Sequence, residues 1–117
     1  MLPRKNRLDL KKEFFQIKKN GKLVEGKFFS FLYNLQQTIV NKQESVFAFV
    51  VSKKIDKRAT RRNRIKRLLS EVVRNFLPEI KPGVEGVFLA KKEILGKSFS
   101  EVKTEAEKIF KKESLLQ

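Results

Sequence analysis

Apolar residues between positions 61 and 76 recur at intervals of three and four, which is the spacing of one face of an α-helix. These residues are Ile65, Leu68, Leu69, Val72, Val73 and Phe76. Polar positions map to the opposite side, namely Asn63, Arg67, Ser70 and Arg74. The pattern predicts a helix that docks on a sheet through one side and presents cations with the other. Thr60 is a suitable N-cap, and Pro78 followed by Pro82-Gly83 would end the helix.

Two further helices are predicted towards the ends of the chain. The first covers about residues 9–20, with Leu10, Phe14 and Ile17 on its inner face. Gly21 can take the left-handed conformation that terminates such a helix. The last helix covers about residues 101–113, and Ser98 or Ser100 would cap it. Its inward-facing residues are Val102, Ala106, Ile109 and Phe110.

Three apolar runs predict β-strands, over residues 27–35, 46–52 and 84–90. Alternation in the first run places Phe29, Phe31, Tyr33 and Leu35 on one face and Phe28, Ser30 and Leu32 on the other. We expect the aromatic face to belong to the core. The second run is apolar on both faces, which favours a central strand, and it would pair antiparallel with the first. The order helix, strands, helix, strand, helix indicates an α+β sandwich around a single sheet.

Composition then limits the function. A chain of 117 residues can form a single domain with one core. Its 28 basic and 13 acidic side chains give a net charge of +15, which favours a polyanionic partner, nucleic acid first and an anionic membrane surface second. The absence of cysteine and histidine removes disulfides, thiolate chemistry, the commonest general base and the commonest metal ligand. Without an apolar run of roughly 20 residues or a signal peptide, a cytoplasmic location is expected.

Arginine, unlike lysine, is concentrated in one segment. Six of the eight arginines lie between positions 58 and 74, and residues 53–67 hold nine cations and one acid, Asp56. A guanidinium group makes paired hydrogen bonds to phosphate and stacks on bases, which an ammonium group does not do. A helix N-terminus also favours phosphate, and Asn63 has a donor and an acceptor for a base edge or a 2′-hydroxyl. The alternative is a solvated basic face on an ordinary amphipathic helix.

The motif Arg62-Asn63-Arg64-Ile65-Lys66-Arg67, preceded by Val51-Ser52-Lys53-Lys54, resembles the protein subunit of bacterial ribonuclease P. That family carries an Arg-Asn-Arg-x-Lys-Arg signature after a Val-Ser-Lys-Lys strand end. Weaker flanking matches extend the resemblance over nearly the whole chain. They are Arg7, Leu8, Glu13, Phe14, Ile17 and Gly21 before the motif, Leu68, Leu69, Glu71 and Arg74 after it, and Pro82, Gly83, Ala90, Lys91, Lys92, Ser98 and Phe99 further on.

The chain also departs from the family pattern. Ser70 stands where the family often has a basic residue, so one RNA contact would be missing. Ala48 replaces a common glycine, Gly86 interrupts the third predicted strand, and Lys18 stands where an aromatic residue is frequent. The connection at residues 56–58 is one residue longer than usual.

The resemblance implies a single-domain α/β sandwich with a four-stranded sheet and three helices in the order α-β-β-β-α-β-α. The second and third predicted strands would then be strands three and four, or residues 27–52 would hold three strands. The motif helix would join two parallel strands by a left-handed crossover, which is an exception to the general right-handed rule.

The resemblance further implies the protein component of ribonuclease P, which assists endonucleolytic removal of the 5′ leader of precursor tRNA. The RNA subunit would perform the chemistry with Mg2+ bound mainly by RNA, so no catalytic residue is assigned to the protein, which would be monomeric alone. Residues implied to bind the catalytic RNA are Lys53, Lys54, Arg58, Arg61, Arg62, Asn63, Arg64, Lys66, Arg67 and Arg74. A cleft between the first helix and the sheet would hold the single-stranded leader. Its candidate residues are Phe14, Lys18, Ser30 and Leu32.

Other functions are compatible with the charge alone. A general basic RNA-binding or ribosomal protein is the first alternative, and the signature at residues 62–67 argues against it. A helix-turn-helix DNA-binding module is disfavoured by strands on both sides of the motif helix. A membrane-surface helix is disfavoured because docking on a sheet explains the apolar stripe better.

Overall fold

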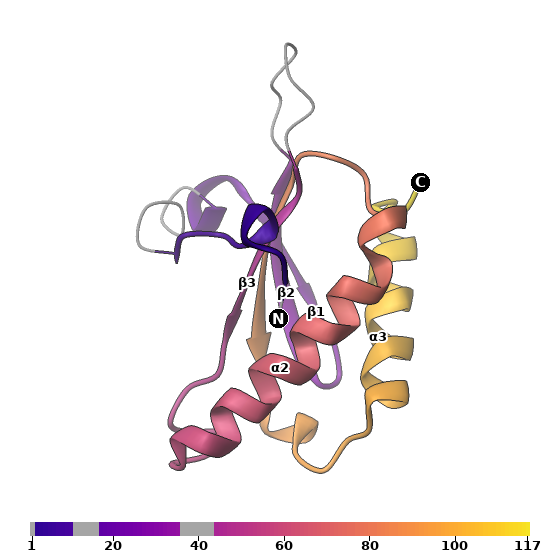
Figure 1. Ribbon diagram of the computed structural model, residues 1–117. Coiled ribbons are helices and arrows are strands. Elements are labelled where there is room, and N and C mark those ends of the chain that lie inside the picture. Colours follow the sequence, from indigo (N-terminus) through magenta and orange to yellow (C-terminus); the bar gives the residue numbers. More distant parts are fainter. Residues whose placement is uncertain (1, 11–16, 36–43) are drawn as a thin grey trace.

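Four strands form one mixed sheet in the order β1-β2-β4-β3 (Figure 1). The computed structural model describes residues 2–10, 17–35 and 44–117. The strands are β1 (Lys22–Glu25), β2 (Phe29–Leu35), β3 (Val46–Val50) and β4 (Val84–Ala90). The four-stranded sheet implied by the resemblance is confirmed. The extra strand lies before the 27–35 run, so the second and third predicted strands are indeed strands three and four.

Strand pairing differs from the expectation in two ways. β2 does not pair with β3, because β4 lies between them, antiparallel to β2 and parallel to β3. β3 is an edge strand rather than a central one. Its apolar character on both faces has another cause: Phe47 packs in the larger core cluster and Val50 against the smaller one across the sheet. The N-terminal segment also covers its edge, since the Leu8 amide donates to the Phe47 carbonyl at 2.9 Å.

The connection from β3 to β4 runs through α2 (Ala59–Phe76) and confirms the left-handed crossover. In Figure 1 both strands point downward, β4 lies to the right of β3, and α2 passes in front of them. Parallel strands connected in this arrangement form a left-handed unit, against the strong right-handed preference. The crossover places the whole length of α2 on one face of the sheet.

The helix ends agree with the sequence in some places only. α3 (Phe99–Lys112) is capped as expected, since the Ser98 hydroxyl accepts a hydrogen bond from the Glu101 amide at 3.2 Å. Thr60 does not cap α2, because the helix begins two residues earlier than expected, at Ala59, and its N-cap is Arg58, which makes no side-chain capping bond. Short 3-10 helices complete the chain: η1 (Arg4–Asn6), η2 (Leu77–Glu79) and η3 (Lys92–Ile94).

The first predicted helix is described at its ends, since residues 10 and 17–20 are helical. Its glycine acts differently from the expectation, because Gly21 is not among the residues with positive φ. A Cβ at Gly21 would lie 2.7 Å from the Tyr33 carbonyl oxygen and closer still to that of Ile17. Glycine is therefore needed for the close approach of helix and sheet. The end of the helix therefore lies close to the β2 backbone at Tyr33.

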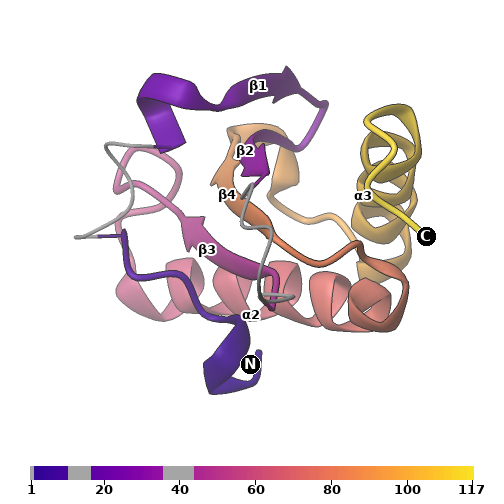
Figure 2. The same cartoon turned by 90° about the horizontal axis from the view of Figure 1, so that it is seen from above.

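The two faces of the sheet pack against different parts of the chain (Figure 2). The larger cluster lies between the sheet and the pair α2 and α3, and Phe29, Phe31 and Tyr33 belong to it as expected. The smaller cluster lies on the other face and joins Ile17 to Leu32 and Val87. The predicted alternation holds for Phe29, Phe31 and Tyr33 against Leu32. It is wrong for Phe28, which precedes β2 and packs against the larger cluster instead of sharing a face with Leu32.

Gly86, which interrupts the apolar run of β4, makes room for two aromatic rings. A Cβ at this position would lie 2.5 Å from the Phe31 ring and 3.0 Å from the Phe47 ring. Those rings come from β2 and β3, the strands on either side of β4. The departure from the family pattern therefore has a packing reason in this chain.

β1 and β2 are tied to the end of α3 through the Glu113 carboxylate. Its Oε1 atom accepts a hydrogen bond from the Tyr33 hydroxyl at 2.7 Å and lies 2.8 Å from the Lys22 Nζ atom. The hydrogen bond from Lys22, followed by that from Tyr33, lowers the pKa of Glu113. Burial, followed by the hydrogen bond to Glu113, raises the pKa of Tyr33 to about 12.

The raised pKa predicts the alkaline titration of this contact. Tyr33 is the only tyrosine and the chain has no tryptophan, so tyrosinate absorbance reports this residue alone. The absorbance should rise near pH 12 rather than near the ordinary value of about 10. Because the folded-state pKa is the higher one, the stability that this group contributes is present below about pH 10 and is lost as pH rises through about 12.

Glu113→Gln should lower the titration midpoint, since it removes the negative acceptor. Glu107→Gln is the matched control, because Glu107 pairs with Lys111 instead. An absorbance midpoint near the ordinary tyrosine value in protein that circular dichroism shows to be folded would contradict the prediction.

Candidate nucleic-acid interface

α2 separates two environments along its whole length. Its inner side contributes buried apolar residues to the larger core cluster, and Leu68 packs against them half-buried. The buried apolar residues are Ile65, Leu69, Val72, Val73 and Phe76. This is the stripe that the sequence predicts, so the opposite side of α2 is free to face a partner.

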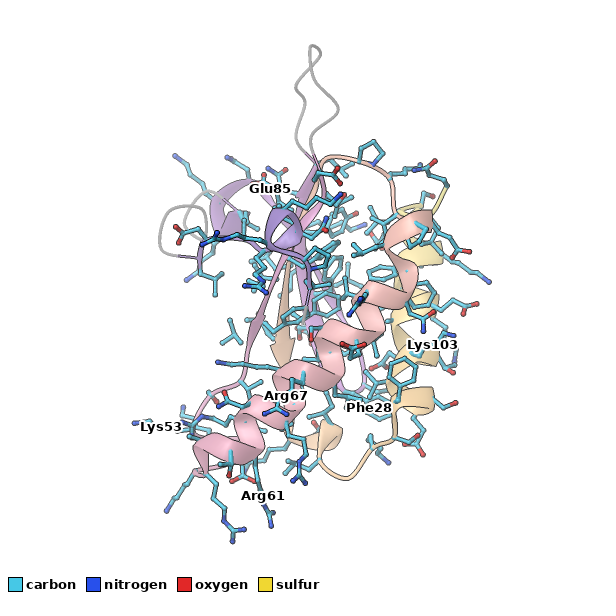
Figure 3. The ribbon with its side chains drawn as sticks, viewed as in Figure 1. Phe28, Lys53, Arg61, Arg67, Glu85 and Lys103 are labelled. Carbon is cyan, nitrogen blue, oxygen red and sulfur yellow. The ribbon has the colours of Figure 1, made fainter. Side chains whose placement is uncertain are left out.

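The predicted RNA-binding residues lie on that outer side and around the end where α2 begins. Arg58, Arg61, Asn63, Arg64, Arg67 and Arg74 are exposed on α2 and at its N-cap, and Lys53 and Lys54 are exposed in the preceding turn, while Arg62 and Lys66 are half-buried. Figure 3 shows Arg67 on the side of α2 away from the sheet, with Arg61 and Lys53 around the end where the helix begins. The structure thus gathers the cations of one segment into a continuous basic surface.

Ser70 does not lie on this surface, contrary to the expectation. It is only 1% exposed, and its hydroxyl donates to the Arg67 carbonyl oxygen at 2.9 Å. At about 100° per residue, Ser70 lies about 60° from the buried Val73, at the border of the apolar stripe. A small residue whose hydroxyl bonds within the helix suits this covered position. The family's basic residue here is therefore not simply missing from an open RNA-binding face.

The beginning of α2 is positively polarised and organised by Asp56. The Asp56 carboxylate accepts from the Arg58 amide at 2.9 Å and lies 3.8 Å from the Arg61 guanidinium. The Arg62 Nη1 atom turns back and donates to the carbonyl oxygens of Asp56 and Lys57, at 3.0 and 2.8 Å. No acidic residue stands in the first turn of α2 to offset the helix dipole. The described arrangement favours anions at this end and gives Arg62 a role in shaping the turn.

Ion pairs neutralise few of the exposed arginines of α2. Arg74 lies 4.0 Å from Glu71, and both side chains are largely exposed, so the pair is weak. Arg61 also stays more than half exposed beside Asp56. The basic surface therefore keeps its capacity to bind phosphate groups.

The predicted leader cleft is described only in part. Phe14 lies outside the described residues. Lys18 is exposed on the helical segment 17–20, and Ser30 and Leu32 lie on the face of the sheet opposite α2. Both strand residues are 7% exposed: Leu32 packs against Ile17, and the Ser30 hydroxyl donates to Glu25 at 3.0 Å. Ser30 and Leu32 therefore share one face of the sheet, and Lys18 is exposed next to Ile17, which packs on that face.

Residues from the β4–α3 connection also approach α2, which the sequence reasoning missed. Leu95 and Lys97 line a groove with Arg64 and Leu68. The spacing of Arg64 and Leu68 predicts one helix edge, but no pattern in the sequence connects that edge with residues 94–97. Only the fold brings the two segments together.

The described chain lacks two other kinds of feature. Within residues 2–10, 17–35 and 44–117, no three histidine, cysteine or acidic side chains are grouped in a way that could hold a metal ion. None of the helices in that same part combines the length and apolar character needed to cross a bilayer.

Comparison with known proteins agrees with the motif and the fold. A family model described as Ribonuclease P matches residues 2–114. A ribonuclease P protein component of Caldanaerobacter subterraneus is 36% identical over 103 residues, covering 88% of this chain and 84% of that protein. One from Synechococcus sp. (strain JA-2-3B'a(2-13)) is 28% identical over 116 residues, covering 99% and 87%. The solved ribonuclease P protein of Thermotoga maritima superimposes with a TM-score of 0.78 at 28% identity, covering 91% of this chain and 96% of that one.

Proposed function

Since this chain belongs to the ribonuclease P protein family, we propose that the outer side of its α2 holds the RNA subunit while the opposite face of its sheet receives the 5′ leader of precursor tRNA. As a family member, the protein is a subunit of a ribonucleoprotein endoribonuclease and acts in tRNA processing, with the ribonuclease P RNA as its partner. The assignment of the two RNA partners to two different surfaces of the protein is our proposal.

One observation carries the assignment of α2. Exposed arginines line one side of the helix while the other side is buried in the core, so the guanidinium groups are held by a rigid element. A guanidinium group can donate two hydrogen bonds to the oxygens of one phosphate. Arginines at fixed spacing along a helix can therefore contact successive phosphates of an RNA backbone. Lys53 and Lys54 extend the same surface beyond the helix N-terminus.

The leader would lie across the sheet, near the first helix. Lys18 would contact a phosphate there and Phe14 would stack a base, because aromatic side chains bind single-stranded bases with little sequence preference. Such tolerance suits a subunit that serves precursors with different leaders. The two RNA partners would then contact opposite faces of one small domain.

The RNA subunit would carry the chemistry, with Mg2+ bound mainly by RNA. The described residues of the protein bring no carboxylate cluster together, and magnesium in phosphoryl-transfer sites is usually held by phosphates, water and a few carboxylates. In this proposal the protein alone is a monomer in the cytoplasm and contributes binding rather than a catalytic group.

Reconstitution tests the proposed function. This protein, mixed with a bacterial ribonuclease P RNA, should increase leader removal at low magnesium compared with the RNA alone, because its cations replace part of the counterion charge. Cleavage would be followed with a labelled precursor tRNA, and binding to an unrelated structured RNA would serve as the control. No gain in cleavage together with equal binding to the unrelated RNA would contradict the proposal.

The leader assignment is tested with Phe14→Ala. The variant should bind precursor tRNA about fivefold more weakly in the holoenzyme, because a base–aromatic stack contributes roughly 1–3 kcal/mol. Affinity for tRNA without a leader should not change, and a thermal melt distinguishes this result from loss of the fold. An equal loss of affinity for both substrates in a folded variant would overturn the assignment.

A further inference from the structure

A groove runs between the first half of α2 and the connection from β4 to α3. Its volume is about 480 Å3, which is within the range of small-ligand sites. The apolar part of its lining includes Leu68 from α2 and Ile94 and Leu95 from the connection. Leu95 is 44% exposed, so its apolar side chain is accessible to a ligand in the groove. The groove therefore offers an apolar surface directly beside the basic surface of α2.

The local backbone keeps this groove open. Gly96 has a φ of +75°, which favours glycine, and a Cβ there would meet nothing within 4 Å. The turn at Gly96 leads through Lys97, which also lines the groove, to Ser98, the N-cap of α3. Residues 95 and 96 thus form one wall without filling the space in front of it.

The charged groups around the groove are mostly cations. Arg61, Arg64 and Lys97 line it, and Asp56 is the acidic residue among them. Arg61 lies 3.8 Å from Asp56, and Lys97 lies 4.0 Å from Glu101. Among the described residues, Arg64 has no salt bridge, so its guanidinium group is available to an anion. The groove combines an apolar wall with a cationic rim.

We propose that this groove binds a single unpaired nucleotide of the RNA subunit, with the base against Leu68 and Leu95 and the phosphate beside Arg64. This inference rests on the proposed binding of the RNA subunit by α2. An unstacked nucleotide has the two surfaces that the groove matches, an apolar base face and an anionic phosphate, and proteins read RNA through such extruded bases. The groove is continuous with the basic surface, since Arg61 and Arg64 belong to both.

A protein partner fits the groove less well. The net charge of +15 and the cationic rim would require a strongly acidic segment, whereas the RNA already bound to α2 brings phosphates to the same edge. The contact would give the basic helix a specific point of attachment within an interface that is otherwise electrostatic. Phosphate contacts alone position a protein without selecting nucleotides.

Leu95→Ala tests the apolar wall without changing charge. With the ribonuclease P RNA, the affinity should fall about fivefold, while the slope of log K against log salt should stay as in the wild type. Chemical probing of the 2′-hydroxyls of the RNA should show one unpaired nucleotide that the wild-type protein protects and the variant leaves reactive. Arg64→Ala should expose the same nucleotide and also reduce the salt slope by about 0.7 to 0.9.

Leu35→Ala is the matched control, because Leu35 is 49% exposed at the end of β2 and does not line the groove. It should leave both affinity and the probing pattern unchanged. If Leu95→Ala matches the wild type in affinity and probing, the groove inference is overturned while the proposed function stands. If the wild-type protein itself fails to bind the RNA subunit and to assist cleavage, the proposed function fails instead.

Discussion

Replacing both Arg64 and Arg67 by alanine is expected to weaken binding to the RNA subunit about a hundredfold at physiological salt. Both side chains are exposed on the outer side of α2. A charge-assisted contact to phosphate contributes roughly 1.5–3 kcal/mol, and exposure reduces this to about 1.4 kcal/mol, or tenfold, for each residue. The slope of log K against log salt should fall by about 1.4 to 1.8, because two phosphate contacts release fewer counterions. Filter binding or fluorescence anisotropy over a range of salt concentrations measures both quantities.

The control must remove the same charge from another face. Lys108→Ala combined with Lys112→Ala does so, since both lysines are exposed on α3. This variant should lose less than about threefold in affinity through the general loss of charge. The free energy of unfolding of both double variants should lie within about 0.5 kcal/mol of the wild-type value, because substitutions at exposed positions away from the core seldom cost more. Equal weakening by the two variants would show that binding depends on net charge and not on α2.

Replacing Phe88 by alanine should have the largest effect on stability, a loss of about 3–5 kcal/mol. Phe88 is 1% exposed on β4, between β2 and β3. Its ring centroid lies 4.7 Å from that of Phe31, 5.0 Å from that of Phe29 and 5.4 Å from that of Phe49. Its removal leaves a cavity that rings on neighbouring strands cannot fill. A domain with the usual 5–15 kcal/mol of stability would lose much of it.

Urea unfolding followed by circular dichroism measures this loss. Phe88→Leu keeps most of the volume and should cost less than about 2 kcal/mol. Phe99→Ala removes the same atoms from a site that is 37% exposed, so it should cost less than about 1 kcal/mol. A Phe88→Ala midpoint close to that of Phe99→Ala would contradict the central position of this ring in the core.

The elements with strong local periodicity could be predicted, and α2 shows why. Apolar residues at a sustained helical spacing fix both the helix and the side that is buried. β1 could not be found in this way, because it has four residues of which Val24 alone is buried. Strand order was also beyond the sequence pattern, since the parallel pairing of β3 with β4 joins residues about 40 positions apart. The antiparallel pair expected for the first two long strands is the simplest local solution, but β4 lies between them.

The candidate site shows the same division. The basic surface comes from one helix and its preceding turn, so the sequence could predict its members. The burial of Ser70 could not be predicted, because it depends on how far the packed side extends around α2. The groove beside Arg64 and Leu95 depends on a contact between segments about 30 residues apart. Neither the edge of α2 nor the connection between β4 and α3 has a sequence pattern that predicts this contact.

Because α2 supplies both a wall of the core and the proposed RNA-binding surface, we expect folding and RNA binding to be thermodynamically linked. An open state that releases α2 loses the buried residues and the aligned arginines together, so RNA binds the folded state alone. Free RNA subunit at a hundred times its Kd would add about 2.7 kcal/mol to the stability of the domain. The net charge of +15 works in the same direction, since self-repulsion in the free protein is relieved in the complex. Protein in excess of its RNA would therefore unfold more often than protein in the complex.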